Sequence, residues 1–181
     1  MVTIHTIGHS TRSLEELLSL LHDAGIALLT DVRRFPGSRR HPQFSRQVMA
    51  SALESANVGY VHEEGLGGRR SVQPGSLNGG WRNRAFRGYA DYMDTPDFRA
   101  ALQRLIDRAR ETSTAIMCAE AVPWRCHRNL IADALFVRGI DVMHILGPGK
   151  VDAHSLSAHA RVLPDGRLIY PGREGQPDLF E

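Results

Sequence analysis

The sequence predicts a single three-layer α/β domain with a mainly parallel sheet flanked by helices. Short β-prone apolar runs alternate with segments of helical periodicity, which is typical of a parallel sheet covered by helices. The chain of 181 residues is long enough to bury one sizeable core, and no linker divides it into two domains. We expect residues 1–163 to form this domain and residues 164–181 to form an extended, turn-rich tail.

The first half of the chain supplies three strands and two helices. Residues 2–7 alternate in polarity and are β-prone, so we expect them to form the first strand. A helix follows between Ser13, which can cap its first turn, and Gly25, which ends it. The remaining elements are expected to be a strand at 26–32, a helix at 45–56 and a strand at 58–62.

The second half begins with a long polar loop at 65–80, and loops of this length are usually functional or disordered. Aromatic residues and arginines follow at 81–93. Pro96 then begins a helix that runs to about Arg110 with apolar residues along one face. The last elements are expected to be a strand at 114–118, a helix that starts near Cys126, and a strand at 141–146 that Gly147-Pro148-Gly149 ends.

The composition excludes several classes of protein. No run approaches the roughly 18 apolar residues that a membrane span requires. The N-terminal residues lack the basic region and apolar core of a secretory signal, so we expect a cytoplasmic location and no membrane partner. The two cysteines are then expected to be reduced thiols.

Arginine dominates the positive charge, because Lys150 is the one lysine among the 22 basic residues. A compositional preference can account for the overall excess, but the arginines also cluster in residues 33–46 and 69–87. Guanidinium groups pair with phosphates and carboxylates, so the clustering favours a nucleic acid or another anionic ligand. The expected phosphate contacts are Arg33, Arg34, Arg39, Arg40, Arg69 and Arg70.

Residues 117–128 hold both cysteines, a carboxylate, a histidine and two arginines. Cys118 and Glu120 would lie at the carboxyl end of a strand, where open α/β sheets bind ligands. Cys126 would lie in the first turn of the next helix, where the helix dipole and neighbouring cations favour a thiolate. A reactive thiol and a buried structural thiol both fit this position, whereas Cys118 has the surroundings of a small core residue.

The spacing of these residues excludes several familiar sites. Cys118 and Cys126 are too far apart for a CxxC redox pair, and Trp124 stands where a phosphatase cradle after Cys118 requires arginine. No zinc ribbon or finger has this spacing, and the adjacent Cys126 and His127 side chains are expected to point in different directions. We therefore expect no metal and no cofactor.

Neighbouring strand ends define the predicted catalytic site. Asp31 follows the second strand and Glu120 follows the strand at 114–118, so both carboxylates would reach one edge of the sheet. Glu120 can serve as a general base or pair with Arg128. The expected catalytic residues are Asp31, Glu120, Cys126 and His127.

Anion and base binding complete the predicted site. The turn after the first strand offers backbone amides and hydroxyls to an anion, and Trp81 can stack on an unpaired base. Besides the clustered arginines, the expected binding residues are His9, Ser10, Trp81 and Arg128.

The last residues of the sequence contain a candidate interaction peptide. Gln176, Leu179 and Phe180 resemble the Gln-x-x-Leu-Phe peptide that binds the bacterial sliding clamp. Such a peptide docks in an extended form, with its Leu-Phe pair in an apolar pocket. The alternative is that Leu179 and Phe180 fold back onto their own domain.

Four short motifs resemble the bacterial and archaeal family called domain of unknown function 488, over roughly residues 3–146. These motifs are Thr6-Ile7-Gly8-His9-Ser10, Asp31-Val32-Arg33 with Pro36, Cys118-Ala119-Glu120, and Cys126-His127-Arg128. The resemblance implies a single α/β domain and supports grouping the motifs in one site. It implies no established reaction.

The leading functional hypothesis is a DNA-associated enzyme of repair or processing, possibly hydrolytic and base-excision-like, recruited by a sliding clamp. Arginine-rich segments around a polar edge, a thiolate or carboxylate at that edge, and the clamp-like peptide support it. One alternative is a thiol-dependent enzyme that binds a small anionic substrate. Another is a non-catalytic adaptor between DNA and the clamp.

Overall fold

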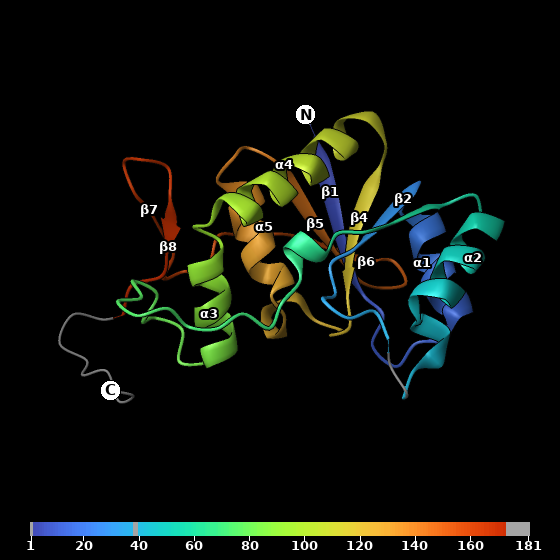
Figure 1. Ribbon diagram of the computed structural model, residues 1–181. Coiled ribbons are helices and arrows are strands. Elements are labelled where there is room, and N and C mark those ends of the chain that lie inside the picture. Colours follow the sequence, from blue (N-terminus) through green and yellow to red (C-terminus); the bar gives the residue numbers. More distant parts are fainter. Residues whose placement is uncertain (1, 38–39, 173–181) are drawn as a thin grey trace.

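The computed structural model describes residues 2–37 and 40–172 and confirms the predicted three-layer α/β fold (Figure 1). Its central sheet has six strands in the order β3-β2-β4-β1-β5-β6. These strands are β1 (Thr3–Gly8), β2 (Leu28–Asp31), β3 (Gly59–His62), β4 (Thr114–Cys118), β5 (Asp141–Gly147) and β6 (Lys150–Ala153). The α-helices are α1 (Leu14–Asp23), α2 (Arg46–Ser55), α3 (Arg84–Tyr92), α4 (Pro96–Glu111) and α5 (Arg128–Phe136).

The first five strands in chain order are parallel, and β6 is antiparallel to β5. Strand β5 ends at Gly147, close to the expected position, and a hairpin turn follows it. Gly149 adopts a φ of 65°, which favours glycine, and the chain turns back to pair as an edge strand.

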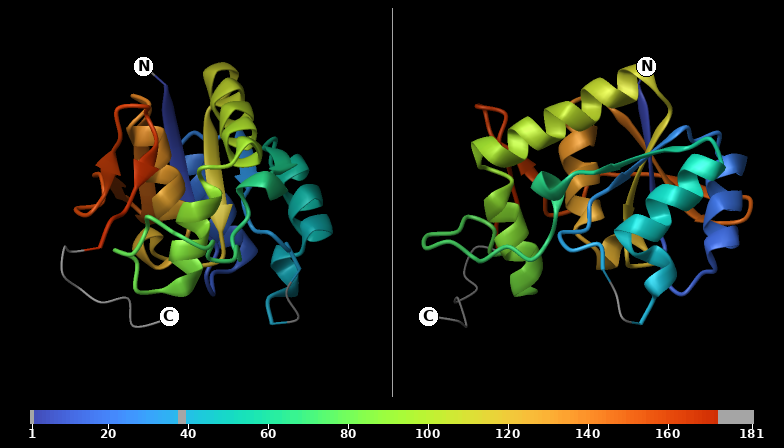
Figure 2. Two further views of the ribbon diagram at one scale, coloured as in Figure 1. Left: turned by 60° about the vertical axis from the view of Figure 1, so that its left-hand side comes forward. Right: turned by 45° about the vertical axis from the view of Figure 1, so that its right-hand side comes forward.

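Helices cover both faces of the sheet (Figure 2). On β4, Ala115 and Met117 belong to the core under α1 and α2, whereas Ile116 and Cys118 belong to the core under α3, α4 and α5. Every residue of β4 is buried, as expected for a central parallel strand. This alternation turns Cys118 toward the helical layer that contains α5.

Local capping explains where the helices begin. Ser13 accepts a hydrogen bond from the Glu16 amide while the Glu16 side chain accepts one from the Ser13 amide, which forms a capping box. Thr95 caps α4, with Pro96 at the first helical position. None of the helices in the described ranges combines the length and apolar character that crossing a bilayer requires.

The structure corrects the boundary expected at residue 163. Strands β7 (Arg161–Val162) and β8 (Leu168–Ile169) form a small hairpin, so the described part of the predicted tail is folded. Tyr170 is fully buried, and its hydroxyl donates to Asp133 of α5 at 2.9 Å. The domain therefore extends at least to Tyr170.

A buried chain of hydrogen bonds links β1, β5 and α5. With both histidines neutral, Thr6 Oγ1 donates to His144 Nδ1 at 2.8 Å and His144 Nε2 donates to His154 Nδ1 at 3.0 Å. His154 Nε2 then donates to Asp133 Oδ1 at 2.9 Å. Because His144 is buried, placing a positive charge on its ring costs free energy.

We predict that this chain makes stability depend on pH. Burial, followed by the charges of His154 and Arg128, lowers the pKa of His144 from 6.5 to about 4. The folded state favours neutral His144, whereas the unfolded chain binds a proton near pH 6.5. The protein is therefore most stable above pH 6.5 with respect to this group, and this stability is lost as the pH falls toward 4. Urea unfolding across this range should show a falling free energy of unfolding, with a smaller fall in His144→Gln.

The matched control is His22→Gln, because His22 is exposed at the end of α1. This control should keep the wild-type dependence on pH. The same dependence in His144→Gln would contradict the assignment to His144.

Candidate functional site

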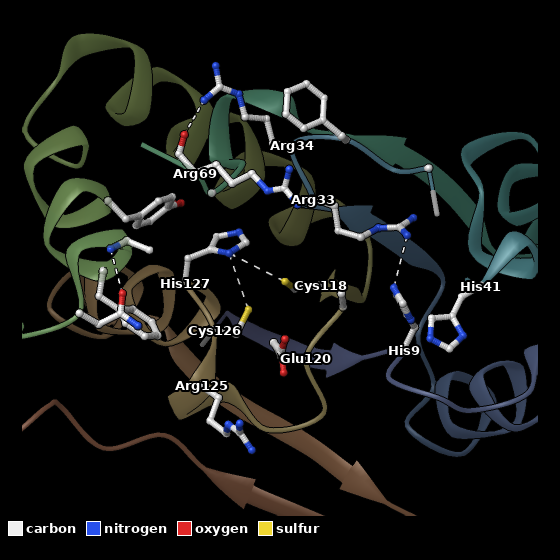
Figure 3. Close-up of a pocket in the computed structure, with 18 residues that line it drawn as sticks. His9, Arg33, Arg34, His41, Arg69, Cys118, Glu120, Arg125, Cys126 and His127 are labelled. Carbon is white, nitrogen blue, oxygen red and sulfur yellow. Dashed lines mark hydrogen bonds between the residues drawn. The ribbon is translucent and has the colours of Figure 1, made fainter. Parts of the chain in front are cut away.

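A pocket of about 490 Å³ opens at the carboxyl ends of β1, β2 and β4 (Figure 3). Gly8 pairs with Cys118, and Asp31 pairs with Met117, so the segments that follow these strands leave the sheet at one edge. The helices that follow β1 and β4 cover opposite faces of the sheet. Such a reversal in connections creates a crevice for ligands in open α/β sheets.

Asp31 lies beneath the pocket and positions Arg33. Its carboxylate is fully buried and accepts hydrogen bonds from Arg33 Nε at 2.9 Å, Arg33 Nη2 at 2.6 Å and the Tyr60 hydroxyl at 2.7 Å. Burial disfavours the charge of Arg33, but the bonds to Asp31 outweigh it and raise the pKa of Arg33. Asp31 does not line the pocket, so the structure places this predicted catalytic carboxylate behind Arg33.

His9 is a neutral neighbour of Arg33 rather than a cation. Burial is the main reason that its pKa is lowered to about 4. In the neutral tautomer, Nδ1 donates to the Ser10 carbonyl at 3.0 Å and Nε2 accepts from Arg33 Nη1 at 3.4 Å. The ring stacks on Phe44 with its centroid 4.3 Å away. His9 therefore holds Arg33 at the pocket wall.

His127 projects its Nδ1 atom toward both cysteines. Its Nε2 atom donates to the Val32 carbonyl at 2.9 Å, which leaves a lone pair on Nδ1. Nδ1 lies 3.8 Å from Cys118 Sγ and 3.7 Å from Cys126 Sγ (Figure 3). The expectation that Cys126 and His127 point apart is therefore wrong, and Cys118 is part of the pocket wall as well as of the core.

Cys126 precedes the helix rather than lying in its first turn. It follows the 3₁₀ turn Pro123–Arg125, and α5 begins at Arg128. The Arg128 amide donates to Cys126 Sγ at 3.5 Å. Burial opposes the thiolate, but the hydrogen bond from Cys118 and the charge and amide of Arg128 lower the pKa of Cys126 to about 7. Donation to Cys126, together with burial, raises the pKa of Cys118.

Arg128 supports the loop behind the pocket. Its side chain is 1% exposed and donates through Nη2 to the backbone carbonyl oxygens of Glu120 at 2.8 Å and Ala121 at 3.4 Å. Of the two alternatives for Glu120, pairing of its carboxylate with the Arg128 guanidinium is therefore not observed. No carboxylate of the described residues forms a salt bridge with Arg128, and the Arg128 amide contacts the sulfur of Cys126.

Glu120 is the one carboxylate among the described residues that line the pocket. Its side chain is exposed, and within the described ranges its carboxylate has no hydrogen-bonding or ionic partner. The loop that carries it packs closely on Gly8, where an added Cβ would lie 1.7 Å from the Glu120 carbonyl oxygen. Glycine at position 8 is therefore required for the observed position of this loop.

One family comparison matches the chain and two other comparisons do not. The family model described as Domain of unknown function DUF488 matches residues 13–135, which is more than half of the chain. The chain belongs to the DUF488 family. A search of curated proteins and a search of solved structures each give no match. The predicted membership is confirmed, and the matched segment carries Asp31, both cysteines and His127.

The mouth of the DUF488 pocket is cationic and aromatic. Arg34, Arg69 and Arg125 line it, and Arg34 donates to the Arg69 carbonyl at 2.6 Å. Phe35 is 61% exposed, with the guanidinium carbons of Arg34 and Arg69 at 5.6 Å and 5.9 Å from its ring centroid. Sequence reasoning missed Phe35 and Arg125, although each stands beside a predicted site residue.

Other predicted binding residues lie outside the pocket. The guanidinium carbon of Arg70 lies 3.7 Å from the centroid of the Tyr92 ring. The Trp81 ring packs against Phe86 and Tyr170, with centroid separations of 5.0 Å and 5.4 Å. Ser10 uses its amide to bond the Ala119 carbonyl at 2.8 Å, and Arg40 does not line the pocket. Four predicted residues lie outside the described ranges, namely Arg39, Gln176, Leu179 and Phe180.

We predict that Asp31→Asn is strongly destabilising in this DUF488 protein. The substitution leaves Arg33 buried without its anionic partner, and breaking a buried pair costs about 3–5 kcal/mol of unfolding free energy. Asp107→Asn is the matched control, because the Asp107–Arg110 pair is exposed and should contribute at most about 1 kcal/mol. Urea unfolding of both variants measures the difference, and equal losses would contradict the prediction.

Proposed function

We propose that this protein is a hydrolytic enzyme of DNA repair or processing that admits one unpaired nucleotide of DNA into the pocket. The observation that carries the proposal is Phe35, exposed beside the guanidinium groups of Arg34 and Arg69 in the pocket lining. An aromatic ring beside guanidinium groups offers a base a stacking surface and the backbone phosphates a cationic path.

The size and charge of the pocket fit the same substrate. A volume of about 490 Å³ lies within the usual range of small-ligand pockets, so a single base and sugar can enter while the rest of the strand stays outside. Arg33 lines the wall as a hydrogen-bond donor whose charge is balanced by Asp31, and Arg125 supplies an exposed positive charge in the pocket lining. These groups favour a phosphate-bearing ligand over a neutral one.

Glu120 is the proposed general base of the hydrolysis. A carboxylate without a hydrogen-bonding or ionic partner among the described residues can accept a proton from an attacking water molecule. Its position in the same pocket as the arginines places this base beside the expected substrate. The other predicted carboxylate, Asp31, already accepts hydrogen bonds from Arg33 and Tyr60.

We predict salt-dependent binding of single-stranded DNA. Fluorescence anisotropy with labelled single-stranded and double-stranded oligonucleotides should give tighter binding of the single strand, and affinity should fall as salt increases. The Phe35→Ala variant lacks the ring on which one base would stack, so it should bind the single strand about tenfold more weakly. Phe136→Ala, which removes an exposed phenylalanine from the far end of α5, should bind like the wild type.

The catalytic part of the proposal is tested with the same oligonucleotides, carrying damaged or mismatched bases. Glu120→Gln should retain binding and lose the release of bases or strand fragments on denaturing gels. Absence of salt-dependent DNA binding would overturn the proposal. Binding of mononucleotides without binding of oligonucleotides would instead support the small anionic substrate.

We also propose that Gln176, Leu179 and Phe180 recruit the enzyme to a bacterial sliding clamp. The sequence of these residues supports this part of the proposal, since they match a clamp-binding peptide. Purified clamp should retain the full chain in a pull-down and should not retain Leu179→Ala with Phe180→Ala. Leu77→Ala, which alters an exposed leucine elsewhere, is the control and should bind normally. Equal retention of the wild type, the double variant and the control would exclude clamp binding by these C-terminal residues.

A further inference from the structure

We propose that Cys118, Cys126 and His127 form a Zn²⁺ site whose fourth coordination position faces the pocket. The two Sγ atoms and a ring nitrogen of His127 all lie within 4.8 Å of one another. Two thiolates and one imidazole form a donor set that zinc uses when one position is left for water or substrate. The metal site rests on its own geometry, whereas its part in hydrolysis rests on the proposed function.

The distances are close to those of an occupied site. With Zn–S bonds of about 2.3 Å and a Zn–N bond of about 2.0 Å in a tetrahedron, sulfur and nitrogen would lie about 3.5 Å apart. His127 Nδ1 lies 3.8 Å from Cys118 Sγ and 3.7 Å from Cys126 Sγ. The two nitrogen–sulfur distances are therefore a few tenths of an ångström longer than in an occupied site, and the two sulfur atoms lie within 4.8 Å of each other.

The orientation of His127 favours a metal at Nδ1. Its Nε2–H group donates to the Val32 carbonyl at 2.9 Å, and metal-binding histidines commonly donate their second N–H in this way. This bond fixes the ring and presents the Nδ1 lone pair to both sulfur atoms. Gly68 leaves room beside the ring, because a Cβ at this position would lie 3.0 Å from Nδ1.

The surroundings also suit the negative charge of a thiolate ligand. The Arg128 amide donates to Cys126 Sγ at 3.5 Å, and the buried Arg128 guanidinium has carbonyl oxygens but no carboxylate as partners within the described chain. Soft sulfur donors favour Zn²⁺ over the hard cations Mg²⁺ and Ca²⁺. The donor set therefore indicates zinc.

An open position would connect this site to Glu120. All three ligands and Glu120 line the same pocket (Figure 3). Zinc lowers the pKa of a bound water molecule. That water would give one proton to Glu120, and its oxygen would bond to the electrophilic atom of the substrate. The bond to the leaving group then breaks, and the leaving group takes the proton from Glu120.

The test measures metal binding directly on the full chain. After removal of metals by a chelator, titration with Zn²⁺ against a chromogenic competitor should give one tight site. Co²⁺ should give thiolate-to-metal charge-transfer bands and the visible bands of a tetrahedral ion. Cys118→Ser, Cys126→Ser and His127→Ala should each weaken Zn²⁺ binding by more than the roughly 10- to 100-fold that loss of an outer partner causes.

Two control variants should retain zinc. His22→Ala alters an exposed histidine on α1, and Glu120→Gln alters the pocket without removing a proposed ligand. X-ray absorption of the zinc-loaded wild type tests the site even where a cysteine variant fails to fold. It should show two sulfur atoms at about 2.3 Å and one protein nitrogen at about 2.0 Å.

Absence of a tight Zn²⁺ site in the reduced wild type would overturn the proposal, and so would a metal shell without sulfur. Unchanged affinity in folded ligand variants would also overturn it. The DNA-binding measurement separates the two proposals. Zinc binding without DNA binding would support the metal site and overturn the proposed function. DNA binding without zinc binding would support the proposed function and overturn the metal site.

Discussion

The parallel pairing of β4 with β1 on one side and β2 on the other is the constraint on which the site depends. It brings Gly8, Asp31 and Cys118 to one edge, although they are far apart in sequence. The His127–Val32 bond then joins the segment after β4 to the segment after β2. The pocket is therefore a product of sheet register, and a shift of one residue would reverse the direction of each side chain.

Two buried arginines give this edge its electrostatic character in different ways. Arg33 has a carboxylate partner in Asp31, so its charge is balanced and its direction is fixed. Arg128 has backbone carbonyls and the Cys126 sulfur as neighbours, so its positive charge acts on the loop and on the thiol. Burial strengthens both effects, because less water is present to screen the charges.

The sequence alone could predict five strands, four helices and the edge at which the motifs meet, but it did not predict helix α3 or strands β6, β7 and β8. Apolar alternation and caps such as Ser13 act locally, so they are visible along the chain. The roles of individual side chains depend on distant partners. Asp31 holds Arg33 and Tyr60 through hydrogen bonds, and His127 turns toward the cysteines because its Nε2–H group donates a hydrogen bond to the Val32 carbonyl. Neither contact has a signal in the spacing of the motifs.

The position of β1 in the sheet also affects how the protein folds during synthesis. This strand is made first, yet its partners are β4 and β5, where Ile4 pairs with Thr114 and Val142. Such non-local contacts form slowly, because a long loop must close before they contribute. On the ribosome, α1, β2, α2 and β3 can emerge before β1 has a neighbour on either edge. The pocket would then assemble late, after β4 and the segment that carries Cys126 and His127 have left the exit tunnel.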